Sequence, residues 1–296
     1  MEVVTIDLKP FDIESAIASY ILLSDKYYIL VETGPKVTVN NLLSTLKEEV
    51  GIKPNEIDYV IVTHIHLDHA GAVGTLIKSM KNAKVFVHPR GYRYLNNPSK
   101  LWKSTLDTLG DVGKYYGEPL PVPRSKLVSI DDKATLDIDE DTMLFLHTPG
   151  HANHHMIIYL VESNILFSGD ALGYYYLGRI MPNTPKPHKY EDAVSSLKRL
   201  KSLKINKVYF THFGECKLGN KVIDLALEKW KLWHDVLWEA YKNDLSIDEA
   251  YKKLLDSDKD LALLSSRVFK PRPYGKHELK VNVEGFIEYF RWKYEG

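Results

Sequence analysis

The chain has little of several features that would assign it to a particular class of protein. Its 296 residues include a single cysteine, Cys216, which excludes an intrachain disulfide framework and fits a reducing cytoplasm. Basic and acidic residues are equal in number, 39 of each, so the composition disfavours nucleic acid as a partner. No apolar run reaches the length of a membrane span, and the N-terminus lacks the pattern of a signal peptide. We therefore expect a cytoplasmic protein that has no membrane partner.

Strand-like and helical patterns alternate along the first 218 residues, and this predicts an α/β domain. The strand-like runs cover residues 3–8, 19–24, 27–32, 57–62, 84–88, 128–146, 155–161, 165–168 and 207–212. The helical patterns cover residues 39–50, the segment after Gly71, and residues 98–112 and 190–201.

The pattern changes after Gly219, and we expect residues 219–296 to form a helical extension on the domain of residues 1–218. Residues 221–241 have apolar side chains, three tryptophans among them, at helical spacing. We expect these tryptophans to pack in a core. Ser246 and Glu249 form a capping box at the start of a second helix over 246–255. A third helix is predicted over 284–293.

One short segment, Thr63 to Gly71, contains four side chains of the types that bind metal ions: His64, His66, Asp68 and His69. Three imidazoles and one carboxylate cannot all face one small ion from so short a loop. We therefore expect two ions, one bound by the two alternating histidines and the other by the adjacent aspartate and histidine. Imidazole nitrogen and carboxylate oxygen suit zinc, iron(II) and manganese(II).

Two ions need more protein ligands than this loop supplies. Three later apolar runs each end in a suitable residue beside a glycine or at a strand end. They end in His151, Asp170 and His212. Polar residues at strand ends are typical of a site at the edge of a sheet.

The segments THIHLDHAGA, TPGHA, FSGDA and THFGE, in this order, resemble the metallo-β-lactamase superfamily. The resemblance covers about residues 1 to 215, and is strongest toward the glyoxalase II-like and lactonase-like branch with a helical C-terminal extension. It implies a four-layer αββα sandwich followed by that extension. Glu32 stands where the family has aspartate in an early Asp-Thr-Gly turn.

Carried over position by position, the resemblance implies two divalent ions, zinc first, with iron or manganese as alternatives. It implies seven ligands: His64, His66 and His151 for one ion, Asp68, His69 and His212 for the other, and Asp170 bridging both. Every one of these positions holds the residue type that the family requires.

The implied activity is hydrolysis of a small ester, thioester or lactone by a hydroxide that bridges the metal ions. Asp68 would be the catalytic residue that orients this nucleophile and passes a proton to the leaving group. Two alternatives stay open within the superfamily. One is a mononuclear iron dioxygenase acting on persulfides, which retains similar ligands. The other is a phosphodiesterase or RNA-processing nuclease, which the absence of an inserted basic arm disfavours. We also expect a homodimer.

Other polar residues are candidates for contacts with a substrate or with the ligands. His88 ends a strand, and it is either a contact of this kind or a hydrogen-bonded structural residue. The consecutive tyrosines Tyr174, Tyr175 and Tyr176 follow Asp170 in a loop. They either donate hydroxyl groups to a substrate or pack against the helical extension. Two more histidines, at 154 and 155, are expected to lie outside the metal site.

Overall fold

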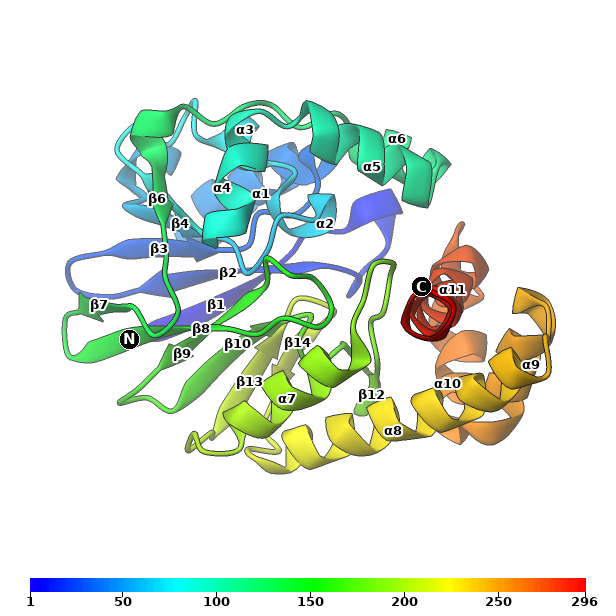
Figure 1. Ribbon diagram of the computed structural model, residues 1–296. Helices are drawn as coiled ribbons and strands as arrows, with labels where there is room; N and C mark the ends of the chain where they lie inside the picture. The colour runs from blue at the N-terminus through cyan, green and yellow to red at the C-terminus, as the bar shows by residue number, and fades with distance from the viewer.

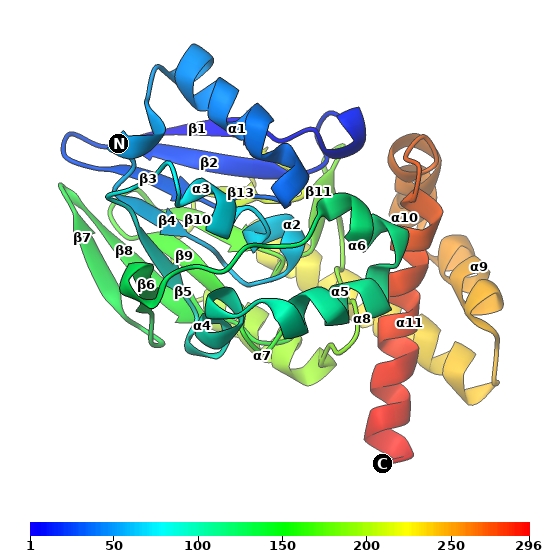
Figure 2. The ribbon, with the colours of Figure 1, turned by 90° about the horizontal axis from the view of Figure 1, so that it is seen from above.

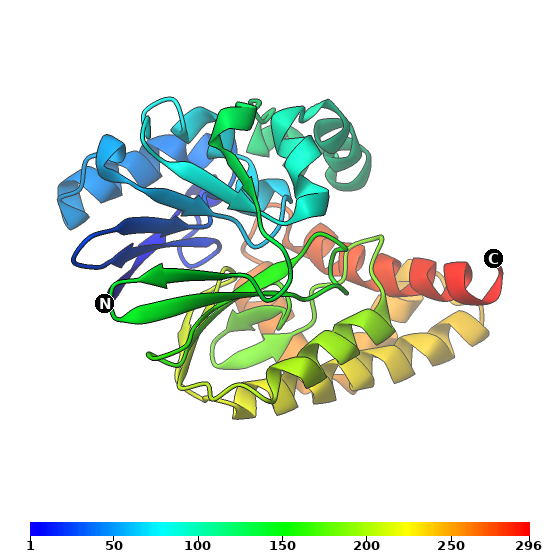
Figure 3. The same ribbon diagram turned by 60° about the vertical axis from the view of Figure 1, so that its left-hand side comes forward.

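In the computed structural model, which describes residues 1–296, two six-stranded β-sheets pack face to face and helices cover their outer faces (Figure 1). This confirms the predicted four-layer αββα sandwich with a helical C-terminal region. The two sheets are seen one above the other in Figure 3. No helix combines the length and the hydropathy that crossing a bilayer requires.

The first sheet has its strands in chain order, antiparallel from β1 to β3 and parallel from β3 to β6. Its strands are β1 (Glu2–Asp7), β2 (Ala18–Leu23), β3 (Tyr28–Val31), β4 (Tyr59–Ile61), β5 (Lys84–Val87) and β6 (Leu127–Ser129). The parallel strands are short and mostly apolar, as expected for strands that are covered on both faces.

The second sheet has the order β14-β13-β10-β9-β8-β7, and only β10 and β13 are parallel. Its strands are β7 (Thr135–Ile138), β8 (Asp141–His147), β9 (Met156–Leu160), β10 (Ile165–Gly169), β13 (Lys207–Phe210) and β14 (Gly214–Cys216). Aromatic side chains from both sheets meet between them, among them Tyr20, Phe86, Phe145 and Phe167. This apolar layer holds the two sheets together. The loops at one edge of the sandwich lie outside it, where they can form a site.

Helices on the first sheet are α1 (Val39–Thr45), α2 (Leu67–Ala70), α3 (Val73–Leu76), α4 (Pro89–Asn96), α5 (Ser99–Leu109) and α6 (Asp111–Tyr116). The single helix predicted over 98–112 is divided at Gly110, whose φ of 53° is outside the helical range. Helix α4 was not predicted. It starts at Pro89, and Nδ1 of His88 accepts a hydrogen bond from the backbone N–H of Arg90.

Helix α7 (Tyr190–Leu200) and the helices of the C-terminal region lie on the side of the second sheet (Figures 1 and 3). The C-terminal helices are α8 (Lys221–Lys242), α9 (Ile247–Ser257), α10 (Lys259–Leu264) and α11 (Gly275–Tyr294). The capping box of Ser246 and Glu249 is present. Helix α11 begins well before the predicted residue 284.

The C-terminal helices and the second sheet share one apolar core. Trp230 and Trp233 are fully buried in it, together with Leu166 and Phe210 of the sheet. Helix α11 lies at the same end of the molecule as α5 and α6 (Figures 1 and 2). The division at residue 218 stays a prediction, since this packing is continuous across it.

Candidate metal centre

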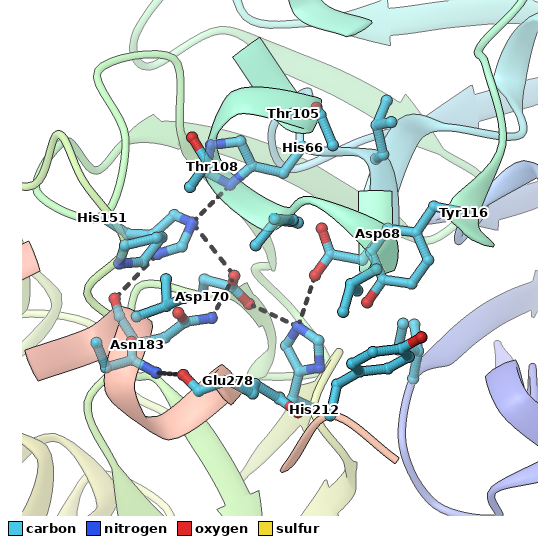
Figure 4. A pocket seen from close by; sticks show the side chains of 18 of the residues that line it. His66, Asp68, Thr105, Thr108, Tyr116, His151, Asp170, Asn183, His212 and Glu278 are labelled. Atoms are coloured by element: carbon cyan, nitrogen blue, oxygen red, sulfur yellow. Dashed lines mark hydrogen bonds and ion pairs between the residues drawn. The ribbon is translucent and has the colours of Figure 1, made fainter. Parts of the chain in front are cut away.

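Four strand ends bring the seven predicted ligands to one edge of the sandwich. The loop after β4 and the short helix α2 supply four of the ligands, which are His64, His66, Asp68 and His69. The segments after β8, β10 and β13 supply His151, Asp170 and His212. Their donor atoms form three overlapping groups in which all atoms lie within 4.8 Å of one another. Figure 4 shows five of these side chains pointing toward a common centre.

The first group consists of three imidazoles. Nδ1 of His66 lies 3.0 Å from Nε2 of His64 and 2.9 Å from Nε2 of His151. Two nitrogens bound to one tetrahedral zinc ion, each at about 2.0–2.1 Å from it, lie about 3.3 Å apart. The three nitrogens therefore approach the spacing that one shared ion requires.

The second group combines a carboxylate with two imidazoles. Nε2 of His212 lies 3.3 Å from Oδ2 of Asp68, and Nε2 of His69 lies 3.8 Å from the same oxygen. This is the set of donors that suits a second divalent ion.

The third group, which consists of His64, His69 and Asp170, shares one histidine with each of the other two, so Asp170 lies between them. Its Oδ2 is 3.3 Å from Nε2 of His151 and 3.2 Å from Nε2 of His69, and its Oδ1 is 3.6 Å from Nε2 of His212. One carboxylate thus faces both groups.

Three donor atoms at this centre are buried and have no hydrogen-bond partner: Nε2 of His69, Nε2 of His212 and Oδ1 of Asp170. Leaving such an atom unpaired costs about 1–3 kcal/mol, and native structures contain few of them. Bound cations would satisfy all three atoms. The residues present therefore fit the divalent ions that the sequence implies.

In four of the imidazoles, Nδ1 forms a hydrogen bond on the side of the ring away from the centre. Nε2 of each of these rings is then directed at the centre. The pairs are His64 with Thr63 Oγ1 (3.1 Å), His69 with Glu32 Oε1 (3.2 Å), His151 with the Asn183 carbonyl (3.0 Å) and His212 with the Ala16 carbonyl (3.2 Å). In the last three pairs the acceptor places the ring proton on Nδ1, so the lone pair of Nε2 is available to a metal ion.

Sequence reasoning identified only part of this supporting layer. Glu32 was noted as a substitution for aspartate, and its longer side chain reaches both His69 and the hydroxyl of Thr63. Ala16 and Asn183 each orient a histidine through a backbone carbonyl, and this role does not depend on the side chain. The amide of Asn183 also donates to Oδ2 of Asp170.

Electrostatics at the centre favour positive charge near the carboxylates. Burial and the neighbouring imidazoles lower the pKa of His64 and of His66 well below the usual value. Burial also opposes protonation of His69, but the carboxylates of Asp170, Glu32 and Asp68 outweigh it and raise its pKa. Burial would raise the pKa of Asp170, but the surrounding histidines hold it well below its ordinary value. The Asp170 carboxylate is therefore ionised, as a metal ligand must be.

A cavity of about 430 Å³ opens onto the centre, and His66, Asp68, His151, Asp170 and His212 all line it. Its wall is mixed. The sandwich contributes apolar side chains, including Ile65, Leu101 and Val112, and the C-terminal region contributes Arg272, Tyr274, Glu278, Val281 and Asn282. Both parts of the chain therefore shape the space beside the metal ligands.

Of the predicted substrate contacts, only Tyr174 lines this cavity, with its ring 4.8 Å from that of His212. The tyrosines belong to an unpredicted hairpin of β11 (Tyr174–Tyr176) and β12 (Arg179–Met181). Tyr175 points to the other face of the strand and stacks on Phe210. The Tyr176 hydroxyl instead donates to the Ala16 carbonyl.

The remaining histidines have different surroundings. His88 lies outside the cavity, where it caps α4 and its ring packs 4.0 Å from that of His147. His154 lines the cavity but belongs to none of the ligand groups. His155 is closer to the site than predicted, because its Nε2 accepts a hydrogen bond from the backbone N–H of Asp170.

The Metallo-beta-lactamase superfamily model matches residues 13–212. The protein ST1585 of Sulfurisphaera tokodaii, described as a metallo-beta-lactamase fold-containing protein, is 31% identical over 69% of this chain and 76% of its own length. The ST1585 crystal structure superposes with a TM-score of 0.71 at 25% identity, covering 97% of this chain and 98% of the other. TTHA1429 of Thermus thermophilus, a metallo-beta-lactamase family protein, gives a TM-score of 0.70 at 23% identity, covering 98% and 93%.

More distant relatives have described activities. An N-acyl homoserine lactonase of a Bacillus species is 27% identical over 64% of this chain and 68% of its own length. An atrochrysone carboxyl ACP thioesterase of Aspergillus fumigatus is 24% identical over 76% of this chain and 44% of its own length. One is thus named as a lactonase and the other as a thioesterase.

Proposed function

Because the chain belongs to the metallo-β-lactamase superfamily, we propose that it is a dinuclear metal-dependent hydrolase of a small ester, thioester or lactone. The observation that carries the dinuclear assignment is the position of Asp170, whose carboxylate lies 3.3 Å from His151 of the first group and 3.2 Å and 3.6 Å from His69 and His212 of the second. The proposed ligands are His64, His66 and His151 for one ion, Asp68, His69 and His212 for the other, and Asp170 for both. Zinc is the proposed metal.

When bound, such ions would lower the pKa of a coordinated water molecule and would polarise the carbonyl group to be cleaved. The protein supplies the rest. Glu32, Asn183 and the Ala16 carbonyl fix the imidazoles in the orientation and tautomer that binding needs. The apolar part of the cavity wall excludes bulk water from the reacting groups, which strengthens the electrostatic interactions there.

Asp68 is the proposed proton carrier. Its side chain is 20% exposed and lines the cavity, whereas that of Asp170 is 1% exposed. Nearby His69 and His212 outweigh the effect of burial and keep the pKa of Asp68 low. Asp68 is therefore an ionised carboxylate that lines the cavity. It can orient a nucleophile, accept the proton of that nucleophile and pass it to the departing oxygen or sulfur.

The substrate class rests on the cavity and on the named relatives. A mixed wall beside the ligands suits a small acyl compound, and a lactonase and a thioesterase are among the relatives. The test is a panel of chromogenic esters, thioesters, lactones and phosphodiesters, assayed with zinc-loaded, manganese-loaded and iron-loaded protein. We expect hydrolysis of acyl compounds. Cleavage of phosphodiesters alone, or oxygen uptake with a persulfide and no hydrolysis, would contradict the proposal.

A further inference from the structure

A buried arginine of the C-terminal region, Arg272, lines the metal cavity, and the carboxylate that faces its charge, that of Glu278, is 3.8 Å away. The Arg272 side chain is only 9% exposed, and its Nε–H has no hydrogen-bond partner. Its guanidinium lies over the rings of Tyr176 (4.7 Å) and Phe269 (5.0 Å). Its other contacts are long, 3.4 Å to the Tyr176 hydroxyl and 3.5 Å to the Ser15 carbonyl. Buried arginines are normally satisfied by close, often bidentate acceptors.

Glu278 on α11 lines the same cavity beside Arg272. Its Oε2 is 3.8 Å from Nη1 of Arg272, which is too far for a hydrogen bond. The carboxyl side chain is 33% exposed, and Figure 4 shows Glu278 on the cavity wall near His212. A carboxyl group keeps an acceptor oxygen whether or not it carries a proton. A donor and an acceptor thus lie side by side, each with unused hydrogen-bonding capacity.

Arg272 and Glu278 carry opposite charges, so a charged ligand group that contacts both is attracted by one and repelled by the other. A net charge on the ligand therefore adds little to its affinity. A neutral group with one acceptor and one donor would satisfy both residues. We propose that Arg272 and Glu278 form a subsite for a carboxamide of the substrate whose C=O and N–H lie on the same edge, as in a primary amide or a lactam. Its carbonyl accepts from Arg272 and its N–H donates to Glu278. A carboxylate would be repelled by Glu278, and an ammonium group by Arg272.

This inference deepens the proposed function and rests on it, because it assigns the amide to a part of the acyl substrate away from the bond that is cleaved. Neither residue belongs to a ligand group. The metal ligands lie on the sandwich, whereas Arg272 precedes α11 and Glu278 is in its first turns. The helical region would therefore select the substrate, and the sandwich would hold the reacting groups.

The test is calorimetric titration of the metal-loaded protein with matched ligands that are not cleaved. Hexanamide, a primary amide, has an acceptor and a donor on the same edge. The methyl ketone 2-heptanone, in which a methyl group replaces the NH2, keeps only the acceptor. Hydrogen bonds to charged groups are strong enough for about a tenfold or larger difference in affinity. We therefore expect the amide to bind at least about tenfold more tightly than the ketone.

Two variants separate the roles. Glu278→Leu should remove the preference for the amide and leave the affinity for the ketone unchanged. Arg272→Met should weaken both ligands by about tenfold, since both present a carbonyl. Matched controls are Arg267→Met and Glu284→Leu, at positions outside the cavity lining, and they should leave both affinities unchanged. Thermal unfolding and metal content of each variant report whether it is folded and loaded.

Equal affinities of the wild-type protein for amide and ketone would overturn the subsite, as would tighter binding of hexylammonium. This comparison needs no variant, so it decides the question even if Arg272→Met fails to fold. Because binding is measured without turnover, the outcome is separate from the proposed hydrolysis. A protein that hydrolyses lactones but shows no amide preference refutes the subsite alone.

Discussion

The side-chain amide of Asn183 donates a hydrogen bond of 2.8 Å to Oδ2 of Asp170. The backbone carbonyl of Asn183 also accepts from Nδ1 of His151. One loop residue thus orients two of the proposed ligands. The next residue, Thr184, is tied to α11, because its backbone N–H and its hydroxyl both donate to Asn282. The C-terminal region therefore braces the loop that supports the metal centre.

Asn183→Ala should lower the affinity for the metal ions by about 10- to 100-fold, the usual effect of losing a residue that orients a ligand. The backbone carbonyl on His151 would remain, so the loss reports the contact with Asp170. Competition with a fluorescent chelator measures the affinity. Asn82→Ala, at an exposed position, is the control. An unchanged affinity in Asn183→Ala would show that the amide does not support metal binding.

Asp170→Ala should lose bound metal and hydrolytic activity together, because its carboxylate faces both groups of ligands. His154→Ala should keep the full metal content, since His154 lines the cavity but is in no ligand group. Elemental mass spectrometry of both variants gives the comparison. Near-normal metal content in Asp170→Ala would refute the bridging role, and a halved content in His154→Ala would add that residue to the ligands.

Gly285→Ala should destabilise the protein by about 1–3 kcal/mol, as overpacked sites do. A Cβ at this position would lie 1.6 Å from the Thr184 carbonyl oxygen, so α11 would have to move away from the loop. Urea unfolding measures the free energy of unfolding, and Glu288→Ala on the exposed side of α11 is the control. Equal stability of the two variants would mean that this close approach does not hold the helix.

His188 should make folding stability sensitive to acid. Burial among Trp230, Phe286 and Tyr289, and then the nearby His151, lower its pKa from 6.5 to about 3. The unfolded chain binds this proton below about pH 6.5 and the folded chain does not, so stability falls as the pH falls from 6.5 toward 3.

His188→Phe removes this proton. In metal-free protein, the free energy of unfolding of the variant minus that of the wild type should therefore be about 1–2 kcal/mol larger at about pH 5 than at about pH 7. Urea unfolding at both pH values measures the change, and the difference should be constant above about pH 7.5. A difference that does not vary with pH would show that His188 titrates normally in the folded protein.

Sequence reasoning located the candidate ligands because each follows an apolar strand, and strand ends meet at one edge of a sheet. It located the supporting residues less well. Ala16 and Asn183 contribute backbone carbonyls, which any residue could supply. The sequence predicts a loop at Tyr174, whereas the structure has a hairpin, because strands of only three residues are too short to give a clear alternating pattern.

The sequence pattern also does not predict the start of α11 at Gly275, because that start depends on packing between chain segments. Gly275 and the prolines before it indicate a break in helical structure, and the sequence pattern is clear only from residue 284. In the fold, a Cβ at Gly275 would lie 1.9 Å from the Phe269 carbonyl oxygen. The glycine is therefore required by a close approach between chain segments, which a sequence pattern does not reveal. This early part of α11 carries Glu278, so the proposed amide subsite could not have been found from the sequence.

The measurement that tests the central claim most directly is the metal content per chain of protein purified without added metal, by elemental mass spectrometry. Two ligand groups joined by Asp170 predict about two divalent ions per chain, zinc first. A single iron ion per chain would contradict the dinuclear hydrolase and place the persulfide dioxygenase first.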